Sequence, residues 1–131
     1  MTRDDVQRWL DRYVHAWQTY DADEIRGLFS EDAEYRYHPW DEPERGRETI
    51  VEDWLHPAGG QQQRDDPATW EGRYEAYAVD GDRAVAIGET TYYTDATRSE
   101  IHRRYANNWL LRFDADGRCT EFVEYYMLRK K

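Results

Sequence analysis

Glu124 is the acidic side chain whose sequence surroundings best suit proton transfer. It lies two residues from Phe122 and two from Tyr126, so in an extended strand these side chains share one face. A carboxyl between apolar rings loses solvation, which raises its pKa and suits it to general acid or base catalysis near neutral pH. Two structural alternatives compete with this interpretation: a carboxylate on an exposed rim, or one paired with Arg104 or Arg112.

His38 and Tyr13 are two further candidates for chemistry. His38 stands directly before Pro39, and an imidazole exchanges protons at cellular pH. The Tyr13 hydroxyl can donate a hydrogen bond to an oxygen that gains negative charge during a reaction. Each has an ordinary alternative: His38 as an exposed residue at a strand end, and Tyr13 as one member of the apolar stripe of a helix.

Aromatic residues supply most of the apolar surface of this chain. Six Trp, eleven Tyr and three Phe occur among 131 residues. Each ring can bury roughly 150–250 Å², and many carry a polar tip. This composition suits a lined cavity better than a purely aliphatic interior, although each ring could equally be plain core. The candidate ligand-binding residues are Trp17, Tyr37, Trp54, Asn107, Trp109, Phe122 and Tyr126.

The charge and the missing motifs exclude several classes of function. A net charge of −10 argues against a nucleic-acid surface and against a polybasic membrane anchor. The four histidines lack metal-binding spacing, and Cys119 is the one cysteine. No glycine-rich phosphate loop occurs, so we expect neither a metal nor a nucleotide cofactor. With no disulfide, no signal-peptide pattern and no long apolar run, we expect a cytoplasmic location without membrane contact.

The first half of the chain has mainly helical periodicity. Thr2 and Asp5 form a capping-box pattern before an apolar stripe that ends at Tyr20, and a short second helix follows over residues 21–29. Residues 33–38 alternate as a strand, and 40–46 are expected to form a loop. A third helix carries Ile50 to Leu55 and stops at Pro57.

The second half alternates as strands. Residues 57–67, rich in Gly, Gln and Asp, are expected to form one loop. Strands are predicted over residues 69–79, 83–94, 101–113 and 118–129, with hairpin turns at 80–82 and 114–117. The order predicts one α+β domain over residues 1–131, in which a cone-shaped, curved antiparallel sheet wraps around three N-terminal helices.

Several short motifs resemble those of the nuclear-transport-factor-2-like / SnoaL-like superfamily, which has the cystatin-like, ketosteroid-isomerase-like fold. The motifs are Arg12-Tyr13-Val14, Leu28-Phe29-Ser-Glu-Asp32-Ala33, His38-Pro39, Gly46-Arg47-Glu48 and Trp109-Leu-Leu-Arg-Phe113. The resemblance covers nearly the whole chain and implies the cone. The superfamily includes isomerases, cyclases, dehydratases, epoxide hydrolases and non-catalytic binders, so the fold does not select a function.

The catalytic positions of the steroid isomerases are only partly matched. Those members use a Tyr on the first helix, an Asp at the end of the first strand and a protonated Asp on a later strand. The resemblance places Tyr13 at the first position. The second falls on Tyr37, or on His38 if one residue is inserted before the proline, and we favour His38. The third falls on Trp109. The same register implies that Trp109 and Glu124 face the concave side of the sheet.

Three functional hypotheses follow. The first is cofactor-independent acid–base catalysis of the isomerase, cyclase or dehydratase type on a small, apolar, oxygenated substrate. In it Tyr13 stabilises charge, and His38 or Glu124 moves the proton. The second is a non-catalytic module that binds a small hydrophobic molecule in the same cone. The third, implied by the resemblance, is a homodimer formed through the convex sheet face around Leu110, Tyr125 and Met127.

Overall fold

Apart from one short additional strand, the helices and strands occur in the predicted order. The structure, a computed structural model, describes residues 1–57 and 64–129. The elements are α1 (Arg3–Thr19), α2 (Ala22–Leu28), β1 (Phe29–Arg36), β2 (Glu44–Arg45), α3 (Arg47–Leu55), a 3-10 turn (Pro67–Thr69), β3 (Trp70–Asp80), β4 (Arg83–Tyr93), β5 (Ile101–Phe113) and β6 (Cys119–Leu128). The predicted α+β class is confirmed.

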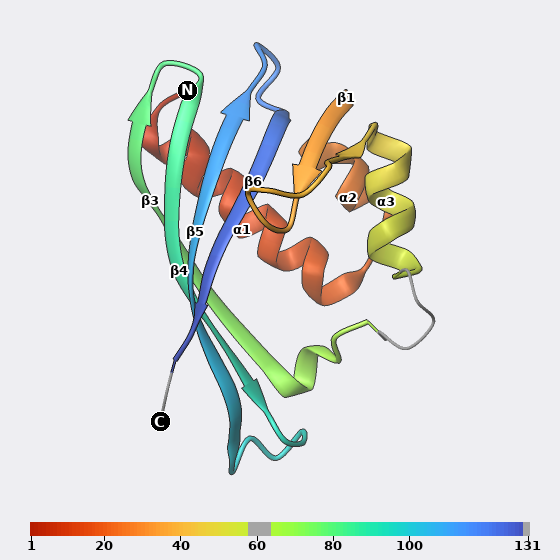
Figure 1. The fold of residues 1–131 in the computed structure, drawn as a ribbon, viewed down its shortest axis with the longest axis vertical. Coiled ribbons are helices and arrows are strands. Elements are labelled where there is room, and N and C mark those ends of the chain that lie inside the picture. Colours follow the sequence, from red (N-terminus) through yellow and green to blue (C-terminus); the bar gives the residue numbers. More distant parts are fainter. Residues whose placement is uncertain (58–63, 130–131) are drawn as a thin grey trace.

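The strands form one open, curved sheet in the order β2-β1-β6-β5-β4-β3. Strands β3 to β6 make the predicted antiparallel meander. β1 lies beside β6 and runs parallel to it, so the sheet is mixed where a fully antiparallel one was expected. The parallel pair arises because the chain leaves β1, passes through α3 and the meander, and returns beside β1 in the same direction. Figure 1 shows α1 crossing the concave side of this sheet.

Helix α1 begins at the predicted capping box. The Thr2 hydroxyl accepts from the Asp5 backbone N–H, and the Asp5 carboxylate accepts from the Thr2 N–H. The buried stripe of the helix carries Trp9 and Tyr13, which are 1% and 5% exposed. Beside this stripe, Gln7 bonds the backbone of β3 at Tyr74 and Ala76. These bonds cover an edge strand that would otherwise present free backbone groups.

Two predicted boundaries around β1 differ from the structure. The strand begins at Phe29 rather than at residue 33, and it ends at Arg36, so Tyr37 and His38 lie just beyond it. The stretch predicted as a loop before α3 contains the short strand β2, which pairs with β1 at Glu34 and Tyr35. The predicted loop over 57–67 falls mostly on residues 58–63, outside the described residues. Among the helices that the structure describes, none is long and apolar enough to cross a bilayer.

The concave side of the sheet is filled by packed rings next to α1. We call this group the inner cluster, and its members are all at most 5% exposed: Trp9, Tyr13, Phe29, Tyr35, Phe113 and Phe122. Trp9 meets Phe29 and Phe113 edge-on, and Phe122 stacks on Tyr35 with ring centroids 4.3 Å apart. The inner cluster therefore forms the floor on which the functional groups rest.

Candidate functional site

Glu124 lies on β6 between two N–H donors from β5. Its Oε2 accepts from the Asn107 Nδ2 and from the Trp109 Nε1, each at 2.8 Å. Trp109 is the direct cross-strand partner of Glu124, and Asn107 is two residues away on the same face of β5. Among the described residues no donor contacts Oε1, and the side chain is half-buried. One carboxylate oxygen is thus anchored, and the other is left for a ligand or water.

A row of hydrogen bonds across four strands orients this carboxylate. Asn107 donates to Glu124 through Nδ2, so its Oδ1 accepts, and it does so from the Thr90 hydroxyl at 3.0 Å. Thr90 has then used its one hydrogen, and its oxygen accepts from the Tyr74 hydroxyl. The row runs from β3 through β4 and β5 to β6, with every donor directed toward Glu124. Because each member has one workable orientation, the Asn107 amide is fixed before any ligand arrives.

Gly88 makes room for the tyrosine at the start of this row. The Tyr74 ring stacks on Trp109 with centroids 4.0 Å apart. A Cβ at Gly88 would collide with the Tyr74 ring and with the Arg73 carbonyl oxygen. A side chain at position 88 would therefore push Tyr74 away from Thr90. Glycine suits position 88 because the Tyr74 ring approaches its backbone closely, and not because the backbone has an unusual angle there.

Burial raises the pKa of the Glu124 carboxyl above its ordinary value of 4.5. The N–H groups of Trp109 and Asn107 and the nearby His38 lower this pKa, because they favour the charged form, but they do not cancel the effect of burial. A carboxyl group transfers protons most efficiently at neutral pH when its pKa is raised toward that pH. A raised pKa is a property expected of a functional carboxyl.

Five tyrosine phenols lie near enough to Glu124 for its charge to act on them. Burial raises the pKa of five phenols, and the Glu124 charge adds to each rise: Tyr13, Tyr35, Tyr37, Tyr74 and Tyr92. The Tyr13 and Tyr35 hydroxyls lie 2.6 Å apart in a buried hydrogen bond. One of these two phenols donates to the other, so the second retains a hydrogen for a ligand oxygen. Tyr35 was not among the candidate residues, although its alternation with Tyr37 along the strand was visible in the sequence.

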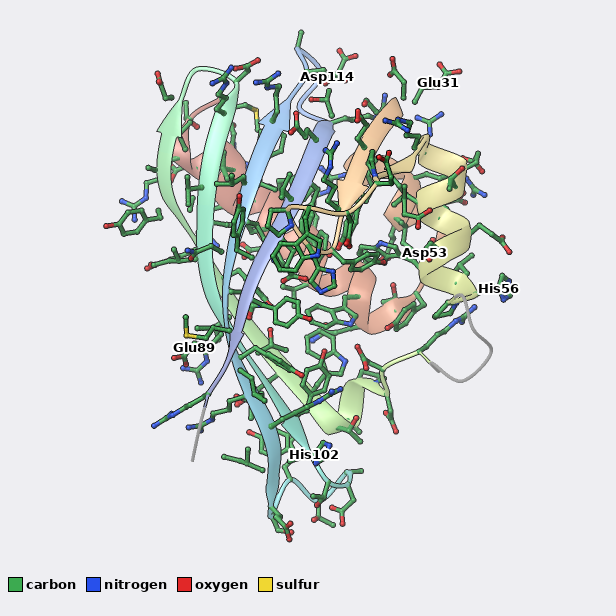
Figure 2. The ribbon with its side chains drawn as sticks, viewed as in Figure 1. Glu31, Asp53, His56, Glu89, His102 and Asp114 are labelled. Atoms are coloured by element: carbon green, nitrogen blue, oxygen red, sulfur yellow. The ribbon has the colours of Figure 1, made fainter. Side chains whose placement is uncertain are left out.

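His38 lies at the rim and bonds neighbouring residues on both sides of its ring. Its Nδ1 is 2.8 Å from the Asp41 Oδ2, and its Nε2 is 2.9 Å from the Tyr126 hydroxyl. Tyr37, the alternative base position, donates to the Asp53 carboxylate at 2.5 Å and packs against Tyr35. Neither residue hydrogen-bonds Glu124. The other histidines are exposed, and Figure 2 shows His56 and His102 away from the group of rings between α1 and the sheet.

Asp65 is a second carboxylate that sequence analysis missed. Its Oδ2 accepts from the Trp17 Nε1 at 2.9 Å and from the Tyr92 hydroxyl at 3.5 Å. Burial raises the pKa of Asp65, while Trp17 and the Arg103 charge lower it. Nothing in the local sequence separates Asp65 from the adjacent Asp66, because the contacts come from elements distant along the chain.

Contacts link most of these groups into a rim that we call the mouth. Its members are half-buried or exposed: Trp17, His38, Asp65, Tyr92, Tyr105, Glu124 and Tyr126. Tyr105 meets the rings of Tyr92 and Tyr126 edge-on, and Tyr126 packs on His38.

Two other candidate binding residues, Trp54 and Phe122, lie behind the mouth. They are buried, and both contact Tyr13. Within the described residues, no three His, Cys, Asp or Glu side chains gather closely enough to hold a metal ion.

A family model described as a SnoaL-like domain matches residues 10–122. The chain belongs to the SnoaL-like domain family. The resemblance inferred from the sequence motifs is thereby confirmed, and so is the cone fold that it implied. A comparison with curated proteins found none whose sequence matches this SnoaL-like domain.

Solved structures with the same fold have different described functions. A candidate ketosteroid isomerase from Kribbella flavida DSM 17836 has a TM-score of 0.67 and 16% identity, over 98% of this chain and 82% of that one. An LEH-like epoxide hydrolase from M. tuberculosis has a TM-score of 0.64 and 15% identity, over 95% and 84%. An NTF-2-like protein of unknown function from Burkholderia xenovorans LB400 has a TM-score of 0.67 and 18% identity, over 98% and 87%. At these identities the likeness concerns the fold alone.

Proposed function

We propose that this SnoaL-like domain binds a small, apolar, oxygenated molecule at the mouth and transfers protons on it without a cofactor. Glu124 is the general acid or base. The observation that carries the proposal is its half-buried carboxylate, whose Oε2 is held by Asn107 and Trp109 while Oε1 has no donor among the described residues. The fold neighbours described as a candidate ketosteroid isomerase and an epoxide hydrolase agree with this class of chemistry.

The arrangement supports two related reactions. With a ketone, Oε1 accepts a proton from the carbon beside the carbonyl, and a phenol of the Tyr13–Tyr35 pair donates to the oxygen that becomes negative. With an epoxide, Oε1 accepts a proton from a water molecule as that water attacks the ring carbon. The C–O bond of the ring breaks, and the phenol of the Tyr13–Tyr35 pair donates to the epoxide oxygen that becomes negative. The raised pKa of both phenols keeps them protonated, so they act as donors at neutral pH.

Glu124→Gln tests the assignment with a matched control. The variant keeps the shape and the two N–H bonds but cannot accept a proton. Glu121→Gln makes the same change of charge on the opposite face of β6. We expect turnover of a β,γ-unsaturated ketosteroid or of a cyclic terpene epoxide to fall by roughly 10²–10⁴-fold in Glu124→Gln and to stay near wild type in Glu121→Gln. Equal rates in wild type and Glu124→Gln would remove Glu124 from the mechanism.

The non-catalytic alternative predicts binding without product. A naphthol, which combines an apolar ring system with one hydroxyl, serves as the probe, and quenching of tryptophan fluorescence measures its binding. Saturable quenching together with no conversion of either test substrate by mass spectrometry would favour the binding module. Product formation that depends on Glu124 would favour the enzyme.

We also propose a homodimer through the convex face of the sheet. Leu110, Tyr125 and Met127 are 42%, 43% and 73% exposed there, an unusual set of apolar side chains to leave in water. Light scattering at micromolar concentration should give twice the mass of the chain, and Met127→Lys should shift the mass toward the monomer. A monomeric wild type would refute the dimer.

A further inference from the structure

His38 cannot meet a ligand directly in the observed arrangement, because both ring nitrogens are already bonded. Asp41 faces Nδ1 and the Tyr126 hydroxyl faces Nε2. An ionised carboxylate only accepts hydrogen bonds, so Nδ1 carries a hydrogen. In the neutral imidazole, Nε2 is then an acceptor and Tyr126 must be the donor. His38 can therefore exchange a proton with a ligand only by way of the Tyr126 hydroxyl.

Protonation of His38 reverses this hydrogen bond. An imidazolium donates from Nε2 to the Tyr126 oxygen, and the phenol hydrogen is released to point elsewhere. Tyr126 then offers a hydrogen to a ligand oxygen, whereas beside a neutral imidazole it offers a lone pair. Among the described residues, the charged and titratable groups near this pair include Asp41 on the loop, Arg36 at the end of β1, Glu124 on β6 and the Tyr105 phenol on β5.

Neighbouring residues hold Asp41 and His38 in place. The Asp41 backbone N–H donates to the His38 carbonyl at 3.1 Å, and the Arg36 Nε donates to the Asp41 carbonyl at 3.1 Å, which fixes the turn that returns Asp41 to the imidazole. Trp40 stacks on His38 with centroids 5.6 Å apart and an interplanar angle of 12°. This order around a half-exposed histidine exceeds what a strand end requires.

Tyr126 and Glu124 share one face of β6. Two residues along a strand span about 7 Å, which is the width of a small ring between two functional groups. Tyr126 is 48% exposed, and its ring contacts His38 and Tyr105 in the mouth. A ligand seated over Glu124 can therefore meet both the carboxylate and the phenol.

We propose that Tyr126, His38 and Asp41 form a proton relay that is the counterpart of Glu124. Tyr126 is the catalytic residue, and His38 and Asp41 act through it. When Glu124 accepts a proton from the ligand, the Tyr126 hydrogen passes to the ligand oxygen, and the Nε2 hydrogen of the imidazolium replaces it on Tyr126. His38 ends neutral and Glu124 ends protonated. Glu124 then gives its proton to a different carbon of the enol, the enol oxygen returns its hydrogen to Tyr126, and Tyr126 returns one to the His38 Nε2, which resets the site. The choice of ligand rests on the proposed function, but the hydrogen-bond arrangement does not.

The first test requires no substrate. Nitrogen-15 NMR of the imidazoles, with His38 assigned through His38→Gln, reports which nitrogen carries the hydrogen. We expect the Nδ1–H form of the neutral imidazole in the wild type. Tyr126→Phe and Asp41→Asn should each change the chemical shift of the ring nitrogen that loses its partner, Nε2 and Nδ1 respectively, whereas Glu124→Gln should preserve the Nδ1–H form. An Nε2–H form in the wild type, or an Nε2 chemical shift that Tyr126→Phe leaves unchanged, would overturn the relay whatever Glu124 does.

The second test uses binding and turnover. Naphthol should bind roughly tenfold more weakly to Tyr126→Phe, the loss expected for one hydrogen bond, while naphthalene should bind equally well to both proteins. Tyr126→Phe and His38→Gln should each slow turnover, and the double variant should be no slower than the worse single one, since the residues act as one unit. His102→Gln, an exposed change on β5, is the control. Independent, multiplicative losses or unchanged naphthol binding would contradict the relay, whereas a lack of turnover with an intact NMR signature would count against the proposed function alone.

Discussion

The inner cluster and the mouth use the same residue types in different ways. In the inner cluster the polar tips bond other groups of the fold: the Trp9 Nε1 donates to the Leu28 carbonyl at 3.0 Å, and the Tyr13 and Tyr35 hydroxyls bond each other, which leaves one phenol hydrogen of that pair for a ligand. In the mouth the polar tips point at groups that titrate. Trp17 donates to Asp65, Tyr126 meets His38, and Glu124 accepts from Trp109, which is itself buried behind the mouth.

This difference separates the aromatic rings that form the core from those that contribute to the candidate site. The carboxyls of Glu124 and Asp65 both have a pKa raised by burial, and both lie in the mouth. The inner cluster contains no carboxylate. An aromatic composition alone therefore does not identify a pocket; the informative rings are those whose N–H or O–H meets an ionisable group. The following changes test that division, from the largest expected effect to the smallest.

Trp9→Ala should give the largest loss of stability. Trp9 is 1% exposed and packs against four other rings of the inner cluster, so its removal leaves a large cavity and an unpaired Leu28 carbonyl. Substitutions of this kind cost about 3–5 kcal/mol. Urea unfolding measures the change, with Tyr126→Ala in the mouth as the comparison. A similar loss for both variants would contradict the division between cluster and mouth.

Thr90→Val should cost less, about 1–3 kcal/mol. The substitution preserves the shape but removes the acceptor of Tyr74 and the donor to Asn107, which leaves two buried polar groups unpaired. We also expect slower turnover, because the Asn107 amide loses the bond that orients it toward Glu124. Thr91→Val, at the neighbouring buried position, is the matched control. Unfolding and turnover that match the wild type would show that the row across the strands has no role.

The sequence predicts the faces of the long elements because periodicity is a local property. The capping box of α1, its buried stripe and the shared face of Asn107 and Trp109 are all found in the structure. The predicted turn at 114–117 even brings Trp109 opposite Glu124 by strand register. Glu124 is held by the N–H groups of Asn107 and Trp109, and not by the arginine partner that the sequence offers as an alternative.

The remaining parts of the site depend on contacts that no local pattern encodes. Asp41 reaches His38 through a turn that the sequence indicates only as a loop. Asp65 meets Trp17 and Tyr92 across 48 and 27 positions of the chain. The parallel pairing of β1 with β6 is likewise set by the path of the whole chain. Periodicity gives the direction of a side chain, but its partners come from tertiary structure.

The pH dependence of stability should separate Glu124 from surface carboxylates. Its folded-state pKa is raised, so its contribution to stability is fully present below its ordinary value of 4.5 and is lost as the pH rises through the folded-state pKa. As the pH rises through the folded-state pKa, the wild type should therefore become less stable relative to Glu124→Gln. Thermal unfolding of both proteins across the acidic to neutral range measures the difference, and Glu121→Gln corrects for the general loss of one charge. A constant difference, or one of opposite sign, would mean that Glu124 is not desolvated.

Trp40→Ala should have the smallest effect on stability and is the sharpest test of the comparison. Trp40 is 81% exposed, so its removal should change the free energy of unfolding by less than about 0.5 kcal/mol, although a tryptophan is the largest side chain that can be lost. Its parallel stacking on His38 instead predicts an effect on the mouth. Without Trp40 the imidazole gains freedom, so the NMR signal of its Nδ1–H should exchange faster with water. If Trp40→Ala unfolds the protein like Trp9→Ala, or leaves His38 exchange unchanged, Trp40 is not a support of the mouth.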